Sequence, residues 1–573
     1  MKKFIFSSML LGGLMMASCS DDVMEAPVQE DVRKEFAKNF IERFGPISRT
    51  QDWTAAKLMK ISINQENVVN AKVEVFAKVY GAYRLAGVYE NVNTGDELTF
   101  TTYKGVEDFM LNIDGVAIQH DEAYNVAESR AFVAVDADKT FTKTTEPLEW
   151  GLTNFNNNLH RPTNGGGNNI NQGYFSSDLM FVHDANNPST YYPIFWDGRE
   201  EYKEHILYLC YNNQDGPQRI PVYNTLNAGT DSQFSGDNGK TYTSFENPKS
   251  YEEKSQNGKK MVKVHGFTPN LPHGALYTFE LEVPALGKTW STSTTAADND
   301  GKVQVGYQRV NTPLNGKEVG MLNFEEEAYE AQKNSSNSNK TESCADFNDF
   351  DMLVVNPNVV SMQPQKWLIA VEDLGTTDDY DFNDIVIEVT QISKNKGKSD
   401  VNITMLAAGG TLEAKLMRDG SQVGPEVHQW FEGVAEGTYP MINTAADMTS
   451  LKRGSTVKFN NVENFTMAAF TEVTPAEMGG FYVIVNGHKE NTVPVKIESP
   501  ERGDVPQIIC VPELWMWPTE RTEMDLAYNK FSQYVQKGGT DELFDGCGYP
   551  TGSWVSYIDW TKVVPRFVMP ISE

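Results

Sequence analysis

The chain has 573 residues and an excess of acidic over basic side chains, with 78 Asp and Glu against 49 Lys and Arg, which gives a formal net charge of −29. This acidity argues against nucleic acid as a partner, because nucleic-acid binding needs basic surfaces. It suits an exported protein that uses divalent cations, although a need for solubility explains it equally well. At about 150 residues per domain, the length predicts three or four domains.

Residues 1–18 have the features of a signal peptide. Lys2 and Lys3 precede an apolar run over residues 4–16, which is shorter than the ~20 residues that cross a bilayer. The ending before Cys19 resembles the lipobox of bacterial lipoproteins, which implies cleavage there and lipidation of Cys19. Residues 20–22 resemble the acidic export tag of Bacteroidetes lipoproteins. We therefore expect a lipid-anchored protein of the outer membrane, on the cell surface or, alternatively, facing the periplasm. An ordinary signal peptide with an incidental cysteine is the other interpretation.

Residues 19–30 form a short acidic tether, and an amphipathic helix is predicted directly after it. Apolar residues recur there at every fourth position, and Gly45-Pro46 ends the pattern; the recurring residues are Val28, Val32, Phe36, Phe40 and Phe44. Alternating segments such as 73–80 and 97–103 then predict strands. Residues 31–145 are accordingly interpreted as this helix plus a small β domain.

The remainder of the chain also has the pattern of β-structure. Strands are predicted at 180–182, 192–196, 205–211, 276–283, 401–406 and 481–485, and a short helix over 525–535. Helices and strands do not alternate regularly, which disfavours a parallel α/β sheet. We expect a mainly β fold: a multi-domain β-sandwich assembly with an N-terminal amphipathic helix, a sandwich over 146–395 and a C-terminal β domain over 396–573.

An acidic loop between two apolar strands is the strongest sign of a site. Asp379, Asp381 and Asn383 occupy alternate positions, which can direct their oxygens toward one cation such as Ca²⁺. The predicted metal ligands of this loop are Asp379, Asp381, Asn383 and Asp384, with Glu372 or Asp373 from the preceding strand end. The loop lacks the glycine and the final glutamate of an EF-hand. The alternative is an exposed turn in which Asp and Asn side chains bond to their own backbone.

A second loop repeats the Asp-Phe-Asn-Asp string ahead of another apolar strand. Its predicted ligands are Asp346, Asn348, Asp349 and Asp351. Two copies of the same string make metal binding, with Ca²⁺ as the cofactor, a stronger hypothesis than either copy alone.

At this point a family resemblance becomes visible. The strings 372–374 and 379–384, together with 408–412, 426–428, 441–444, 512–520 and 527–531, resemble LruC-domain lipoproteins of Bacteroidetes over roughly residues 345–540. The resemblance implies a β-rich, exported, calcium-binding domain of unassigned function, and it makes 396–573 a LruC-like domain. Cys510 and Cys547 are interpreted as local additions to the pattern.

The sequence does not contain a recognisable catalytic motif. It has no H-E-x-x-H, no complete P-loop and no G-x-S-x-G elbow, so we do not predict an enzyme. Four cysteines follow Cys19, and an oxidising compartment allows disulfides; the pair Cys510 and Cys547 is the most economical of the possible pairings. His428 is interpreted as structural. The tryptophans could stack on sugars, but core packing is the favoured role.

These features predict a calcium-stabilised surface lipoprotein that acts as a binding or adhesion module. Its partners would be the membrane, through the lipid anchor, and a glycan or a surface protein. A hydrolase of extracellular polysaccharide and a purely structural envelope subunit are the alternatives.

Overall fold

The fold is known from a computed structural model that describes most of the chain from residue 22 onward. Residues 22–30, predicted as part of an acidic tether, already belong to the N-terminal helix, so the tether prediction is wrong for these residues. The described residues are 22–79, 81–125, 140–145, 148–151, 178–195, 204–213, 216–224, 255–256, 259–264, 266–293, 305–324, 350–373, 379–445, 452, 454–465, 481–486, 494–513, 515–537, 554–559 and 561–564. Cys19 and the whole predicted signal peptide lie outside them, so lipidation stays a prediction.

The architecture is mainly β, as the sequence predicts. The first strands are β1 (Ala56–Ser62), β2 (Ala71–Val79), β3 (Ala82–Val92), β4 (Glu97–Tyr103), β5 (Phe109–Ile113) and β6 (Val116–Gln119). A middle group follows: β7 (Phe141–Lys143), β8 (Leu148–Gly151), β9 (Leu179–Val182), β10 (Thr190–Phe195), β11 (Ile206–Asn213), β12 (Gly216–Asn224), β13 (Ser255–Gln256), β14 (Lys259–Val264), β15 (Phe267–Pro269), β16 (Leu276–Val283), β17 (Lys288–Ser291), β18 (Val305–Leu314), β19 (Lys317–Phe324), β20 (Phe350–Val355) and β21 (Val359–Pro364).

The C-terminal group contains the remaining strands and most of the helices. Its strands are β22 (Lys366–Val371), β23 (Ile385–Ser393), β24 (Lys398–Ala407), β25 (Ala414–Arg418), β26 (Ser421–Gln422), β27 (Thr456–Glu463), β28 (Phe481–Val485), β29 (Val495–Glu498) and β30 (Ile508–Pro512). The helices are α1 (Asp22–Phe44), α4 (Met524–Ala527) and α5 (Phe531–Lys537), with the 3-10 turns η7 (Asn395–Gly397), η8 (Val427–Trp430) and η12 (Trp554–Ser556).

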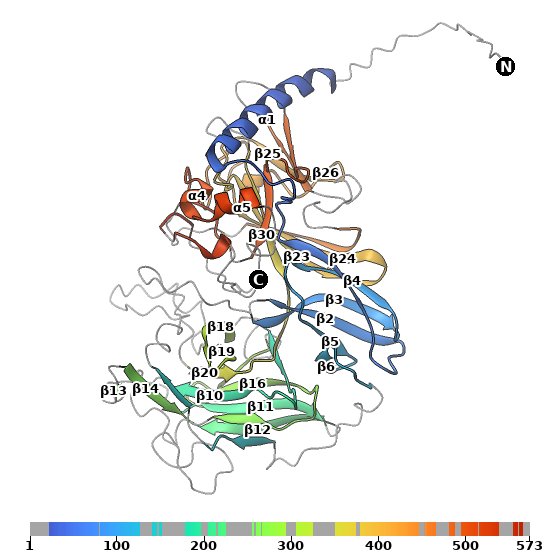
Figure 1. The fold of residues 1–573 in the computed structure, drawn as a ribbon, viewed down its shortest axis with the longest axis vertical. Coiled ribbons are helices and arrows are strands. Elements are labelled where there is room, and N and C mark those ends of the chain that lie inside the picture. Colours follow the sequence, from blue (N-terminus) through green and yellow to red (C-terminus); the bar gives the residue numbers. More distant parts are fainter. Residues whose placement is uncertain are drawn as a thin grey trace, which may run out of the picture.

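One large sheet joins the three groups. Its main path runs β12-β11-β16-β9-β21-β3-β2-β5-β6, and β23 branches from β3 toward β22, β24, β27 and β30. β21 lies parallel to β3, and this pairing connects the middle group to the first strands. Figure 1 shows α1 and the C-terminal strands at one end of the molecule, the middle group at the other, and β2 to β6 between them. The domain boundary predicted at residue 395 falls in the hairpin between β23 and β24, which pair along their length.

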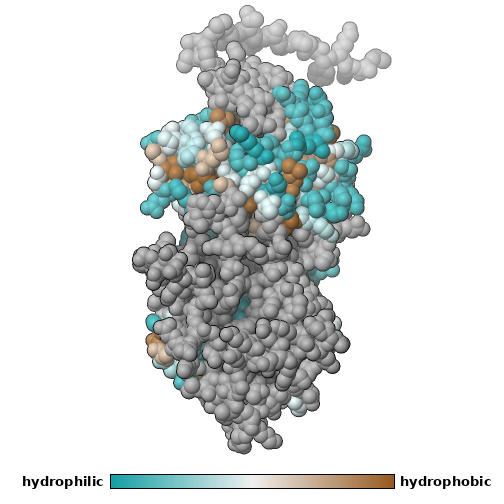
Figure 2. Space-filling view, turned by 90° about the vertical axis from the view of Figure 1, so that its left-hand side faces the viewer, coloured by the Kyte–Doolittle hydropathy of each residue, from teal (hydrophilic) through white to brown (hydrophobic). Residues whose placement is uncertain are grey.

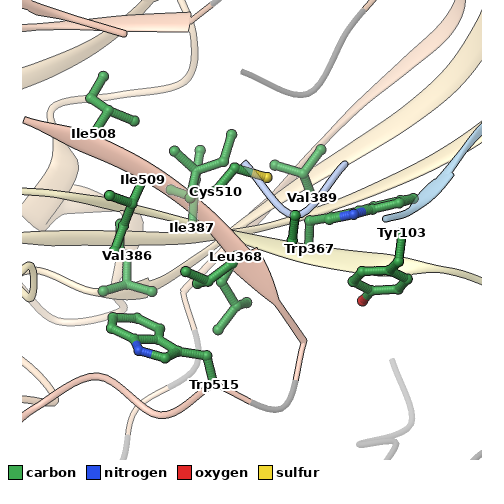
Figure 3. Packing of buried hydrophobic residues seen from close by; sticks show 14 of the residues in the cluster. Tyr103, Trp367, Leu368, Val386, Ile387, Val389, Ile508, Ile509, Cys510 and Trp515 are labelled. Atoms are coloured by element: carbon green, nitrogen blue, oxygen red, sulfur yellow. The ribbon is translucent and has the colours of Figure 1, made fainter. Parts of the chain in front are cut away.

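The core divides in the same way. One cluster of buried residues extends from α1 through the first strands into the C-terminal group, and a second fills the middle group. In the first cluster, β22 pairs with both β23 and β30, so the apolar residues of all three strands share one layer. Figure 3 shows Leu368, Ile387 and Ile509 packed there, with Trp367 against Tyr103 and Trp515 at the edge. Burial of such side chains contributes about 1.5–3 kcal/mol each.

Helix α1 confirms the apolar pattern for its last three positions, while the side chains of Val28 and Val32 lie outside the described ones. Phe36, Phe40 and Phe44 are all buried, and the helix ends at Phe44. Gly45 follows with a φ of +91°, a conformation that favours glycine, and a Cβ there would lie 2.5 Å from the amide nitrogen of Gln536. Position 45 therefore favours glycine because of its backbone conformation, and a larger residue there would also have to displace the side chain of Gln536.

The single helix predicted over 525–535 is wrong in detail. The chain forms α4 and α5 with Tyr528 between them in an extended conformation. Tyr528 pairs with Ile558 as an isolated β-bridge, and its hydroxyl donates to the carbonyl of Met516 at 2.6 Å. These tertiary bonds interrupt a segment whose local pattern is helical.

Candidate metal site

The acidic loop connects β22 to β23 at one end of the large sheet. Because β22 and β23 are antiparallel, with Val371 opposite Ile385, Glu372 and Asp373 leave one strand close to where Asp384 enters the next. Residues 379–384 form the described return of this loop. Its position at the ends of two buried strands fixes both of its stems.

Side chains of the loop alternate between two environments. Asp381 and Asn383 are buried together with Glu372, while Tyr380 and Phe382 are buried within the hydrophobic core. Tyr380 and Phe382 have φ values of 51° and 52°, in the left-handed region that bulky L-residues rarely adopt. Such conformations cost of order 1–3 kcal/mol each and occur mostly at functional sites.

Three carboxylates of the loop are close enough to bind one ion. Glu372, Asp379 and Asp381 each offer an oxygen, and these oxygens lie within 4.8 Å of one another. Oxygens that bind one Ca²⁺ at 2.3–2.6 Å are separated by up to about 5 Å. Among the described residues, no other group of three or more His, Cys, Asp or Glu side chains meets this condition.

Backbone amides orient these carboxylates. The amide of Phe382 donates to Oε2 of Glu372 at 3.2 Å. Asp381 accepts from the amide of Asn383 at 3.1 Å and, through its other oxygen, from the amide of Arg521 at 2.9 Å. These bonds set the positions of the oxygens, but each leaves the negative charge in place.

The carboxyl groups of the site are buried close to one another, which makes their ionised forms unfavourable. Burial, followed by the charge of Asp384, raises the pKa of Glu372 well above its ordinary value. Burial, followed by the charge of Asp379, likewise raises the pKa of Asp381 well above its ordinary value. Burial, followed by the charge of Asp373, does the same to the pKa of Asp384. In the part of the chain that the structure describes, no Lys or Arg forms an ion pair with Glu372, Asp381 or Asp384. The cluster therefore needs either protons or a bound cation.

Asn383 supplies an independent sign of a ligand. Its side chain is fully buried, and its amide nitrogen donates to the carbonyl of Pro518 at 3.1 Å. Its Oδ1 has no hydrogen-bond partner. A buried acceptor without a partner costs about 1–3 kcal/mol, a penalty that coordination to a cation would remove.

A pair of glycines closes one side of the loop. The amide of Gly409 donates to the carbonyl of Asp384 at 2.9 Å. A Cβ on Gly409 would lie 2.3 Å from Oδ1 of Asn383, and a Cβ on Gly410 would lie 2.6 Å from Oδ2 of Asp373. At Gly409 a side chain would also lie 2.8 Å from the backbone carbonyl of Asn383, so only glycine fits there, whereas at Gly410 a side chain would have to displace the carboxylate of Asp373.

Glu520 is a further candidate that was not predicted as a ligand. Burial raises its pKa, with the charge of Asp379 as the next cause, so it lies on the same cluster. Its amide donates to the carbonyl of Thr444 at 2.9 Å. The string 512–520 formed part of the family resemblance, but no spacing in the sequence places Glu520 beside a loop some 140 residues earlier.

Of the four ligands predicted in the second loop, the structure describes only Asp351. Asp346, Asn348 and Asp349 lie outside the described residues. Asp351 is fully buried in β20 and accepts a hydrogen bond from the amide nitrogen of Asn323, its neighbour on β19. This cross-strand pairing gives Asp351 a structural partner, and metal binding at the second loop remains a prediction for the other three residues.

Cys510 is a free thiol, so the structure does not contain the predicted disulfide with Cys547, which itself lies outside the described residues. Cys510 lies within β30, opposite Ile369, and is fully buried. Burial raises the pKa of its thiol to about 11. The side chain acts as a small apolar residue of the core, which is a common role for cysteine.

The seven tryptophans considered for stacking on sugars are Trp196, Trp367, Trp430, Trp515, Trp517, Trp554 and Trp560, and the five of them that the structure describes belong to the core. Trp367, Trp430, Trp515, Trp517 and Trp554 are all buried. Among the coloured residues of the face in Figure 2, hydrophobic residues lie in small groups between hydrophilic ones. Core packing, the favoured interpretation, therefore accounts for these five residues, and Trp196 and Trp560 lie outside the described part.

Comparison with protein families found no matching family, and comparison with curated proteins found no match either. The resemblance to LruC-domain lipoproteins therefore rests on the motifs alone. In the described residues, no helix is long and apolar enough to cross a membrane.

Proposed function

We propose that this chain is a LruC-type lipoprotein, anchored in the outer membrane and displayed at the cell surface, in which calcium stabilises a β-rich binding or adhesion module. Calcium would be bound by Glu372, Asp379 and Asp381, with Oδ1 of Asn383 completing the set from the same loop. The bound ion supplies positive charge to a buried anionic cluster. The ion would link the end of β22 to the start of β23, two strands whose apolar residues form part of the C-terminal core.

The observation that carries the proposal is the combination of buried carboxylates with the unpartnered Oδ1 of Asn383. The donor set consists of oxygens only, which suits hard cations. Calcium tolerates irregular coordination by six to eight oxygens, whereas magnesium demands near-octahedral geometry. A loop with several fixed protein oxygens therefore favours calcium.

The proposed partner of the module is a glycan or another surface component. Trp367, Trp430, Trp515, Trp517 and Trp554 are buried and offer no stacking surface to sugars. Binding on a glycan array without release of product would support the binding module. Release of product from a polysaccharide would instead favour the hydrolase.

Thermal unfolding with and without calcium tests the metal site. Extracellular calcium modules bind with Kd of about 10⁻⁴–10⁻³ M. At ~2 mM calcium and a Kd of ~10⁻⁴ M, binding adds roughly 1.8 kcal/mol to the folded state. For a cooperative unit of 150–250 residues, this free energy raises Tm by roughly 4 to 7 °C. Calcium should restore the Tm of metal-stripped protein better than magnesium does.

A matched pair of variants identifies the site. Asp381→Asn with Asp384→Asn should abolish the response to calcium, because the charge of one proposed ligand and that of the buried carboxylate beside Glu372 are both removed. Glu97→Gln with Glu463→Gln changes the net charge equally at two exposed positions and should leave the response intact. Superimposable melting curves of the unmutated protein with and without calcium would refute the calcium site.

A further inference from the structure

The acidic loop is also where the N-terminal helix packs. The rings of Phe36, Phe40 and Phe44 on α1 lie with their centroids 4.9, 5.6 and 5.7 Å from the ring of Tyr380. Tyr380 stands between the candidate ligands Asp379 and Asp381. One residue of the loop thus contacts all three described aromatic residues of the helix's apolar face.

Hydrogen bonds fix Tyr380 at both ends. Its hydroxyl donates to the carbonyl of Phe36 within α1 at 3.1 Å. Its own carbonyl accepts from the amide of Met524, the first residue of α4, at 3.2 Å. The ring of Tyr380 is therefore held against the helix by a polar contact as well as by packing.

The backbone conformation of Tyr380 links this contact to the ligands. With φ at 51°, its ring points toward α1 while the neighbouring carboxylates face the cluster. A left-handed tyrosine persists only where its surroundings enforce it. If repulsion among unneutralised carboxylates lets this backbone relax, the direction of the ring changes with it.

From this geometry we propose that the acidic loop is a docking site for α1 and that its bound cation keeps the site in the docking conformation. The inference rests on the proposed calcium site. Loss of the ion would loosen the helix while the sheets stay folded. Because α1 begins three residues after Cys19, calcium would in this way determine how rigidly the body is attached to its lipid tether.

Contacts outside the loop limit the size of the effect. Phe40 also packs against Trp53, with ring centroids 6.0 Å apart, and Phe44 packs against Phe531 at 5.2 Å. Arg43 forms an ion pair with Glu523. These contacts do not involve the loop, so removal of calcium should increase local opening of α1 without full unfolding.

Hydrogen exchange on the full chain tests the proposal. In the presence of 2 mM calcium, amides of residues 36–44 should exchange slowly, and removal of calcium should accelerate them about tenfold or more. Amides of β16 in the middle group should exchange equally in both conditions. Calcium binding is measured on the same samples by calorimetry.

Two substitutions separate helix docking from metal binding. Tyr380→Ala should accelerate exchange in α1 even with calcium present, and Tyr380→Phe, which removes only the bond to Phe36, should give a smaller increase. Tyr211→Ala, in the other core cluster, is the control and should leave α1 unchanged. If Tyr380→Ala fails to fold, Tyr380→Phe and the calcium-free unmutated protein still provide the test.

The outcomes distinguish this inference from the proposed function. Measurable calcium binding with no change in α1 exchange overturns the docking role and leaves the calcium site standing. Absence of calcium binding overturns both. Calcium-dependent protection of α1 that disappears in Tyr380→Ala supports both.

Discussion

Nε2 of His428 lies 2.8 Å from the carbonyl oxygen of Gly410, one of the two glycines that contact the candidate metal ligands. Nδ1 of the same ring lies 2.7 Å from Oε1 of Glu426. The imidazole thus lies between the carboxylate of Glu426 and the carbonyl of Gly410, within hydrogen-bond distance of both. Glu426 and His428 therefore position the glycine pair, and through it the acidic loop.

This arrangement predicts that His428→Gln weakens calcium binding about tenfold, because loss of a supporting partner typically costs 10–100-fold in metal affinity. Calorimetric titration with calcium measures the change. The control is His273→Gln, which removes a histidine that pairs with Glu122 far from the loop. Equal affinity in the unmutated and His428→Gln proteins would show that the glycine pair needs no such support.

Gly410→Ala tests the same contact from the other side. The added Cβ would lie 2.6 Å from Oδ2 of Asp373 and must displace that carboxylate. We expect a rise of tenfold or more in the calcium Kd, together with a lower Tm in calcium. An unchanged Kd in the folded variant would mean that Asp373 moves without consequence for the site.

The pH dependence of stability should change sign with calcium. Burial raises the pKa values of Glu372, Asp381 and Asp384 in the metal-free protein. For an acid whose pKa is higher in the folded than in the unfolded state, the stabilisation is complete below the unfolded value of about 4 and is lost as pH rises through the folded value. Metal-free protein should therefore lose stability from pH 4 upward. Bound calcium favours the ionised carboxylates, so its stabilising effect should grow over the same range.

Melting curves of metal-stripped protein, with and without calcium, measure this difference at each pH. The difference in Tm should increase from pH 5 to 8. It should be flat in Asp381→Asn with Asp384→Asn, which removes two of the titrating groups. A difference that is constant with pH in the unmutated protein would contradict the assignment of the carboxylates.

The local features of this fold were predictable from local pattern. Strands at 97–103, 276–283 and 481–485 agree with β4, β16 and β28, and the four-residue spacing of phenylalanines gave α1. The acidic loop was predictable for the same reason, since its ligands lie within a few residues of one another. The period and spacing of apolar or acidic residues are properties of neighbouring positions, so these elements can be predicted from a short stretch of sequence.

Contacts between distant segments were beyond such reasoning. Glu520 and the glycine pair reach the loop from other parts of the chain, and β30 pairs with β22 although some 140 residues separate them. No periodicity in one segment specifies which remote segment packs on it. His428 was interpreted as structural, and only its bonds to Gly410 and Glu426 reveal that its role concerns the candidate site.

Replacement of the predicted lipidation site tests the export hypothesis. In Cys19→Ala, the thiol that would accept the lipid is absent, so the protein should leave the membrane fraction or remain unprocessed. Membrane fractionation with metabolic lipid labelling measures this. Cys210→Ala, which alters a half-buried free thiol in β11, is the control and should stay membrane-bound. A Cys19→Ala protein that still carries lipid would refute the lipoprotein interpretation.

The ion pair of Arg84 and Glu513 should be essential to the junction between the first strands and the C-terminal group. The side chains are 0% and 1% exposed, and Nη1 lies 2.7 Å from Oε2. Arg84 also donates to the carbonyl of Pro364 at 2.6 Å. Removal of one partner of a buried pair leaves an uncompensated charge and costs about 3–5 kcal/mol, whereas apolar replacement of both partners is often neutral.

A double-mutant cycle separates these two effects. Arg84→Met alone should destabilise the protein strongly in denaturant unfolding, and Glu513→Leu alone should do so as well. The double variant should be more stable than either single variant, because neither charge is then left buried. Lys60→Met with Glu97→Leu removes an exposed pair and should change stability by less than about 1 kcal/mol. Additive losses at Arg84 and Glu513 would mean that the bond to Pro364, rather than the ion pair, dominates the junction.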